Sequence, residues 1–192
     1  MSRLDDTSRS WLQLADAPLA GEVREIIEHT KAKVGHYRHA QHVLAHNPAL
    51  LIAQDALSRA LNQSQDSGLP PLERELIALV VSSENRCAPC VFAHAASLRA
   101  LSEDSAWVGL LEVNYRHAPL SQRQRALADY AWKITTRPQA ITAEDLQPLR
   151  AAGLSERDII DAAGIASYFN YSNRINSALG IRPNTEAYLE AR

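Results

Sequence analysis

The residues of this chain with the clearest chemical potential are its two cysteines, which lie close together in the segment Cys87-Ala88-Pro89-Cys90. His94 follows about one helical turn after the second cysteine. In a helix these three side chains stand at positions i, i+3 and i+7 and share one face, and residues three apart have Cβ atoms roughly 5–6 Å from each other. That spacing permits a disulfide after a small local adjustment. The motif is typical of a pair that alternates between dithiol and disulfide in an intracellular protein.

Three effects can favour the thiolate form of these cysteines. In the first turn of a helix, the helix dipole and the free backbone amides stabilise negative charge. His94 can accept the proton of Cys90 or pair with its thiolate, and a nearby carboxylate can orient the histidine or relay protons. A thiolate attacks a peroxide oxygen and becomes a sulfenic acid, which the neighbouring thiol resolves as a disulfide. An external reductant must then restore the dithiol.

The same residues support other interpretations. A dithiol of this kind could act as a disulfide oxidoreductase on protein or low-molecular-weight disulfides. Cys87, Cys90, His94 and Glu75 together offer four potential zinc ligands, although adjacent positions on a helix make a tetrahedral site awkward. The cysteines could also be small buried apolar residues, and Glu75, like Glu73, could be a charge that suits a helix N-terminus and nothing more.

Hydrophobic periodicity predicts helices along the chain, and no segment has a convincing strand pattern. Residues 72–83 are apolar on every side, which indicates a central, buried helix. The CxxC motif opens the next helix, where Pro89 is tolerated because first-turn amides have no intrahelical acceptor. The other predicted helices run from Gly21 to Gly35, over 37–46, 49–63 and 123–135, briefly after the capping-box pattern at 141–144, and from 153–158 towards Leu179, with Gly180 as a C-cap.

The expected fold is therefore all-α. We treat residues 1–192 as one domain, with an N-terminal arm and helices over 1–66 and a core that carries the CxxC motif over 67–192. The polar stretch 1–20, which has scattered apolar anchors such as Trp11, is expected to be an arm that docks on a neighbouring molecule. The early helices also carry a group of histidines, which we interpret as a solvated or subunit-facing surface; a metal site is the alternative, but no acidic or cysteine ligand stands among them. These are His29, His36, His39, His42 and His46.

Composition limits the classes of partner. The formal net charge of −2 argues against nucleic acid or an anionic membrane as the main partner. No apolar run approaches the roughly 20 residues that a membrane span needs, and the N-terminus lacks the apolar region of a secretory signal. We expect a cytoplasmic protein, in which thiols are held reduced and a CxxC is more plausibly catalytic or metal-binding than structural.

A longer pattern resembles a known family. Glu75 followed after eleven residues by Cys87, then Cys90 and His94, is similar to the active-site pattern of the AhpD-like alkylhydroperoxidases, which belong to the carboxymuconolactone decarboxylase superfamily. The resemblance covers most of the chain and is weakest before residue 21. Residues 120–135, 153–155 and 168–174 look like the branch called uncharacterised peroxidase-related enzymes.

The resemblance implies an all-helical AhpD-like bundle that assembles as a homo-oligomer and uses thiols, without haem, flavin or another cofactor and without a metal, to reduce organic hydroperoxides. It implies that Cys90 is the peroxidatic thiol, that Cys87 is its disulfide partner, and that Glu75 and His94 form a proton relay. The implied partners are a hydroperoxide and a thiol or dithiol reductant. One departure is that Pro89 stands where the family's best-studied pattern has a histidine, which weakens the implied relay and leaves open which cysteine attacks first. Lactone decarboxylation is not expected, because the decarboxylase branch lacks the cysteine pair.

Polar residues on the last long helix are a further candidate group. We expect them to serve polar packing or subunit contact, and the alternative is that they line the thiol pocket. They are Tyr168, Asn170, Asn173 and Arg174.

Overall fold

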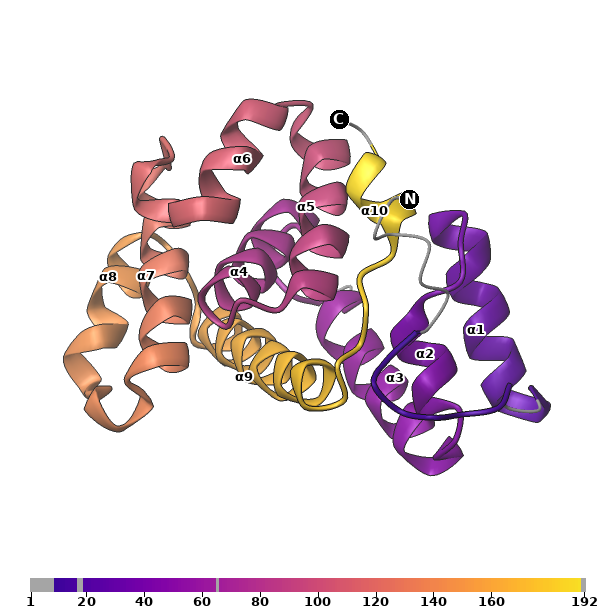
Figure 1. Ribbon diagram of the computed structural model, residues 1–192. Helices are drawn as coiled ribbons and strands as arrows, with labels where there is room; N and C mark the ends of the chain where they lie inside the picture. The colour runs from indigo at the N-terminus through magenta and orange to yellow at the C-terminus, as the bar shows by residue number, and fades with distance from the viewer. Residues whose placement is uncertain (1–8, 17–18, 65, 191–192) are drawn as a thin grey trace.

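The computed structural model describes residues 9–16, 19–64 and 66–190, which form ten α-helices and three short 3₁₀ helices and contain no β-strand (Figure 1). The all-α prediction is therefore confirmed. The α-helices are α1 (Gly21–Val34), α2 (His39–Leu44), α3 (Pro48–Asn62), α4 (Pro71–Glu84), α5 (Ala88–Ser102), α6 (Ser105–Asn114), α7 (Gln122–Thr136), α8 (Gln147–Ala151), α9 (Glu156–Ala178) and α10 (Thr185–Leu189). The 3₁₀ helices are Tyr115–His117, Pro138–Ala140 and Ala143–Leu146.

Helix α4 is the centre of the main core. Its apolar residues point in every direction, and Leu76, Ile77 and Leu79 are fully buried. The helix begins with Pro71 in its first turn, where a missing amide costs nothing. It packs against α5, α6, α7 and α9, and all five helices contribute to one buried apolar cluster. Because α4 is surrounded by other helices, each polar or charged side chain on it faces one of these neighbours.

The N-terminal helices form a smaller layer beside this core. Helices α1, α2 and α3 enclose their own apolar cluster, which includes Ile27 and Leu51, and Ile175 and Leu179 near the end of α9 pack against it. Figure 1 shows α1–α3 on the side of the bundle opposite α7 and α8. Helix α9 therefore connects the two clusters, and the functional groups on its C-terminal half lie between them.

The C-terminal segment closes over α5. Arg99 of α5 is 4% exposed and donates hydrogen bonds to the backbone carbonyls of Ala187 and Glu190, at 3.2 and 3.0 Å, and it also pairs with Glu112 at 3.1 Å. The rings of Phe92 and Tyr188 meet at 4.9 Å. A buried arginine with these partners fixes α10 against the helix that carries the cysteines.

The arm that was expected to dock on a neighbouring molecule is described in part, since residues 1–8 and 17–18 lie outside the described residues. Its described part bonds to its own chain and leaves Trp11 73% exposed, so docking on a neighbour stays a prediction. The Trp11 amide donates to the Leu179 carbonyl at 3.1 Å, and the Arg182 amide donates to the Arg9 carbonyl at 2.9 Å. The Trp11 indole covers Gly180, which has a φ of 59° and no Cβ to obstruct the ring. This segment is therefore held by its own C-terminal turn.

Two helices were not predicted from the sequence. Helix α6 begins after Asp104, whose carboxylate accepts the Trp107 amide at 2.8 Å, but Gly109 in its middle and apolar residues on more than one face hide its periodicity. Helix α10 is a short segment that owes its position to Arg99. In the described ranges, no helix is long and apolar enough to cross a membrane.

Candidate functional site

The cysteines lie at the N-terminus of α5. Cys87 is the N-cap residue and Cys90 stands in the first turn, so both residues lie at the positive end of the α5 helix dipole. The turn that leads into the helix places Arg86 in the left-handed region, with a φ of 53°, and the Cys87 amide donates to the Ser82 carbonyl at 3.0 Å. Pro89 occupies the first turn, as its sequence position predicts.

The two thiols are free, buried and joined by a hydrogen bond. Their Sγ atoms are 3.1 Å apart, and the residues are 1% exposed for Cys87 and 6% for Cys90. The bond to Cys90 is the main cause that lowers the pKa of Cys87 to about 7, and the same bond together with burial raises the pKa of Cys90 well above its usual value. The pair therefore loses its first proton near neutral pH and keeps the second, as coupled groups do.

An asparagine of α9 completes the environment of the sulfurs. Asn176 is 6% exposed, and its Nδ2 donates to Cys90 Sγ at 3.1 Å. A proton that remains in the pair has only the distance between the two sulfurs to travel, so the negative charge can reside on either sulfur. When it resides on Cys90, the Asn176 amide and the Cys87 thiol both donate to it, and hydrogen bonds to a charged acceptor are the stronger ones.

Glu75 and His94 are joined by a hydrogen bond, and both line the cavity that Cys90 lines. Glu75 projects from α4 and His94 from α5, and the distance between Glu75 Oε2 and His94 Nδ1 is 2.7 Å. The carboxylate contacts Nδ1, so Nε2 is the ring nitrogen that Glu75 does not engage. The edge of the Phe169 ring packs against the imidazole, with centroids 4.4 Å apart, and fixes its orientation. Glu73 points elsewhere and pairs with Arg123 of α7 at 2.8 Å.

A cavity of about 210 Å³ connects these groups. Cys90, His94 and Glu75 line it, whereas Cys87 does not. Its walls come from α5 and α9 on one side and from the N-terminal helices α1–α3 on the other, with Ala187 of α10 at its edge. Of the two sulfurs, Cys90 is thus the one that a small molecule in the cavity meets, and Cys87 lies behind it.

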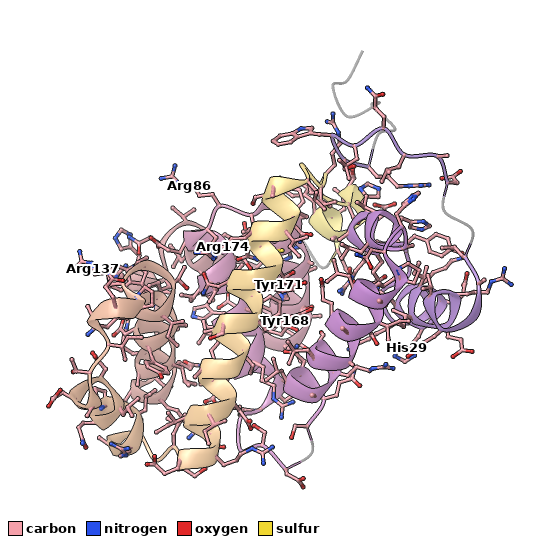
Figure 2. The ribbon with its side chains drawn as sticks, turned by 90° about the horizontal axis from the view of Figure 1, so that it is seen from below. His29, Arg86, Arg137, Tyr168, Tyr171 and Arg174 are labelled. Atoms are coloured by element: carbon pink, nitrogen blue, oxygen red, sulfur yellow. The ribbon has the colours of Figure 1, made fainter. Side chains whose placement is uncertain are left out.

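The polar residues of α9 divide between the two predicted roles. Tyr168 lines the cavity, on the side of α9 that faces the N-terminal helices (Figure 2). Asn173 is fully buried, accepts the Asn85 amide at 3.0 Å and donates to Ser82 at 3.2 Å. Asn170 accepts the same Asn85 amide and the Arg174 guanidinium, at 3.0 and 2.6 Å. The expectation of polar packing therefore holds for these asparagines and Arg174, and the pocket alternative holds for Tyr168.

The five histidines are exposed or partly buried: His29 and His46 are exposed, and the other three are intermediate, so a solvated or subunit-facing surface stays the prediction. His29 and His36 line the cavity, and the His39 ring contacts the Arg182 carbonyl at 3.1 Å. His42 packs edge-on against Tyr37, with centroids 5.2 Å apart, and burial lowers its pKa. Throughout the described ranges, no three or more His, Cys, Asp or Glu side chains are grouped so that they could hold a metal ion.

The sequence analysis missed Asn176 and the basic wall of the cavity. A signal for Asn176 was present, since Asn170, Asn173 and Asn176 recur every three residues in a long helix and so share one face. Arg38 and Lys33 gave no such signal, because only the packing of α1–α3 on the core brings them to the cavity.

Comparison with known proteins places this geometry in context. Residues 48–110 match the carboxymuconolactone decarboxylase family. The chain is 39% identical to an uncharacterised peroxidase-related protein from Silicibacter sp. TM1040, with a TM-score of 0.89 over 96% of each chain. It is 32% identical to an uncharacterised peroxidase-related protein with an alkylhydroperoxidase AhpD core from Ralstonia eutropha JMP134, with a TM-score of 0.85 over 94% of this chain and 98% of that one.

A more distant structure shares the fold alone. The debrominase Bmp8, in complex with 2,3,4-tribromopyrrole, is 18% identical to this chain, with a TM-score of 0.78 over 93% of this chain and 95% of that one. No protein of curated function matches the sequence.

Proposed function

We propose, since this chain belongs to the AhpD-like carboxymuconolactone decarboxylase superfamily, that it is a thiol-dependent peroxidase that reduces organic hydroperoxides through its CxxC dithiol. Members of this superfamily are enzymes, and two of the similar structures are described as peroxidase-related. One arrangement carries the proposal: Cys90 lines a cavity together with the Glu75–His94 pair, and Cys87 Sγ lies 3.1 Å behind Cys90 Sγ.

The first step is the attack of the Cys90 thiolate on the terminal oxygen of the hydroperoxide. The O–O bond breaks, its electron pair leaves with the alkoxide, and Cys90 becomes a sulfenic acid. The alkoxide needs a proton to depart as the alcohol. His94 lines the same cavity and can supply that proton from Nε2, and Glu75, 2.7 Å from Nδ1, orients the imidazole.

The second step is resolution. Cys87 attacks the sulfur of the Cys90 sulfenic acid, the S–O bond breaks as the disulfide forms, and the hydroxide leaves as water with the proton that the Cys87 thiol gives up. The 3.1 Å separation of the sulfurs means that this step requires little movement. A dithiol reductant then transfers two electrons and two protons to restore Cys87 and Cys90 by thiol–disulfide exchange.

Access favours Cys90 as the attacking residue, although the pKa of Cys87 is the lower one. The charge can pass between the sulfurs by movement of the shared proton, whereas the line of approach is fixed by the cavity. The proton relay then consists of His94 and Glu75 alone, because the saturated hydrocarbon side chain of Pro89 has no group that gains or loses a proton. We therefore expect Pro89→His to raise the peroxidase rate, most clearly below neutral pH, where its imidazole is charged.

The burial of both cysteines argues against the alternative of a disulfide oxidoreductase that acts on folded proteins. Residues that are 1% and 6% exposed do not present their sulfurs to the surface of a folded protein substrate. A peroxide or a slender dithiol can enter the cavity, so we infer that the reductant is a small dithiol or a dithiol on a flexible arm. Zinc binding receives no support from the arrangement of side chains in the described part of the chain.

The test is consumption of an organic hydroperoxide in the presence of a dithiol such as dihydrolipoamide, with wild type, Cys90→Ser and Cys87→Ser measured side by side. We expect turnover in the wild type only, with a single stoichiometric reaction in Cys87→Ser. Equal activity in all three proteins would rule out the proposal. Faster reduction of insulin than of peroxide would favour the oxidoreductase instead.

A further inference from the structure

The cavity has two chemically different walls. Toward the sulfur, Pro89, Ala93 and Phe169 from α5 and α9 give it an apolar lining. The opposite wall, from α1, α2 and their connection, is basic and contains Lys33 and Arg38, with His29 and His36 nearby. Figure 2 labels His29 on the N-terminal helices and Tyr168 beside α9, and both residues contribute to the lining of the cavity.

The acidic residues of the cavity do not neutralise this wall. Asp55 pairs with Arg59 at 2.7 Å, and Glu75 pairs with His94 at the same distance. Within the described residues, neither Lys33 nor Arg38 forms an ion pair with a carboxylate. Arg38 is half-buried, which makes its charge more effective than that of an exposed lysine.

Tyr168 marks the place where the positive charge acts. Burial raises the pKa of its hydroxyl, while hydrogen bonds with Ser58 and Gln54 and the positive charge of Arg38 lower it. Arg38 and Ser58 from the N-terminal wall and Tyr168 from α9 all line the cavity, and together they offer a cation and two hydroxyl groups, which are groups that bind a carboxylate.

The same region contains polar atoms without partners. Gln41 Oε1 and Gln54 Oε1 are buried and have no hydrogen-bond partner. Both residues line the cavity. Buried acceptors are almost always satisfied in native proteins, so these two need donors from water or from a ligand. Both atoms are acceptors, so a carboxylate, which has no proton to donate, does not satisfy them; they mark this wall as polar, while the attraction for an anion comes from Arg38.

We propose that the hydroperoxide substrate is a short-chain organic acid, with its carboxylate bound by Arg38 at the N-terminal wall and its hydroperoxide group directed to Cys90. The inference rests on the proposed function for the role of the hydroperoxide group, but the carboxylate site itself does not depend on it. The apolar lining between the two ends accommodates the carbon chain, and a volume of about 210 Å³ suits a short chain. Arg38 is then a binding and specificity residue with no part in the redox steps.

The experiment uses probes that cannot react with the thiols. Binding of hexanoate and of its neutral counterpart hexanamide is measured by NMR titration for wild type, Arg38→Gln and Arg137→Gln. Arg137 is an exposed residue next to Trp132 and, in Figure 2, lies on the other side of α9 from His29, so its replacement changes the net charge equally without touching the cavity.

We expect hexanoate to bind about tenfold more tightly than hexanamide in wild type and in Arg137→Gln, the factor given by one charge-assisted hydrogen bond. Arg38→Gln should bring hexanoate to the affinity of hexanamide and leave hexanamide unchanged. Equal binding of the two probes to the wild type, or hexanoate binding that survives in Arg38→Gln, would overturn the proposal.

An activity measurement separates this proposal from the preceding one. For 6-hydroperoxyhexanoate, Arg38→Gln should raise KM about tenfold, while KM for the methyl ester stays unchanged. If hexanoate binds through Arg38 but neither hydroperoxide is consumed, the carboxylate site stands and the peroxidase function fails. If both hydroperoxides are consumed with the same KM, the peroxidase function stands and the carboxylate site fails.

Discussion

Replacing Asn176 with alanine removes the amide that donates to Cys90 Sγ at 3.1 Å, and it leaves the second buried thiol in place. The expected effect is a higher pKa for the first ionisation of the dithiol. A hydrogen bond to a charged group contributes about 1.5 kcal/mol at the lower end of its range, which corresponds to about one pKa unit. We use the lower end because the bond between the two thiols, and not Asn176, is the main cause of the low pKa.

The size of the expected fall in peroxidation rate follows from the fraction of the dithiol that carries a thiolate. The dithiol of the wild type ionises at a pKa of about 7, so about half of it carries a thiolate at pH 7. A shift of about one unit leaves about a tenth as thiolate, so peroxidation at pH 7 should fall about fivefold and recover as the pH rises above about 9. Asn176→Asp should shift the pKa further, because a carboxylate beside the sulfur repels the thiolate.

The assay is the rate of alkylation by iodoacetamide as a function of pH, measured together with the rate of peroxidation. Asn170→Ala is the matched control, because it removes a polar side chain of the same helix that bonds to Asn85 and Thr135 and not to sulfur. It should leave the midpoint near pH 7. Identical midpoints for wild type and Asn176→Ala would refute the reasoning, provided that thermal unfolding shows both proteins to be folded.

Three further predictions concern other parts of the site. Cys87→Ser should accumulate a Cys90 sulfenic acid after one equivalent of peroxide, which mass spectrometry detects as a dimedone adduct. Cys90→Ser should give no adduct. An adduct in Cys90→Ser would make Cys87 the attacking residue. Glu75→Gln should slow peroxidation about tenfold to a hundredfold in stopped-flow kinetics without moving the alkylation midpoint, because it disturbs the imidazole and not the thiols. Glu73→Gln, its control, should lower the unfolding temperature and keep the rate, and equal slowing by both would contradict the assigned relay. Arg99→Met should lower the free energy of unfolding by about 3 kcal/mol in urea denaturation, because buried carbonyls of the C-terminal segment lose their donor, and a change below about 0.5 kcal/mol would contradict the role given to Arg99.

The sequence predicted the local features of the site. The apolar run of α4, the proline in the first turn of α5 and the spacing of Cys87, Cys90 and His94 all follow from helix geometry, which is short-range. The choice between Glu73 and Glu75 does not follow from it. Side chains two residues apart on a helix point to nearly opposite sides. Glu75 contacts His94 and Glu73 contacts Arg123 only because α4 packs against both α5 and α7.

The groups that complete the site depend on long-range packing. Asn176 meets Cys90 across 86 positions of sequence, and its helical periodicity alone does not tell which helix its face contacts. Arg38 reaches the cavity only because α1–α3 pack on the end of α9. The fold class and the dithiol motif could therefore be predicted, whereas the cavity and its basic wall could not. The homo-oligomer and the cytoplasmic location stay predictions.

The central claim is that the two sulfurs cycle between dithiol and disulfide, and its most direct test is titration of the reduced protein with one equivalent of an organic hydroperoxide, followed by mass analysis of the peptides that contain Cys87 and Cys90. The account predicts that both thiols disappear together, that the intact protein loses two hydrogen atoms and remains monomeric on a denaturing non-reducing gel, and that a dithiol restores the original mass. Thiols that stay unlinked, or sulfinic acid that accumulates on one of them, would contradict it.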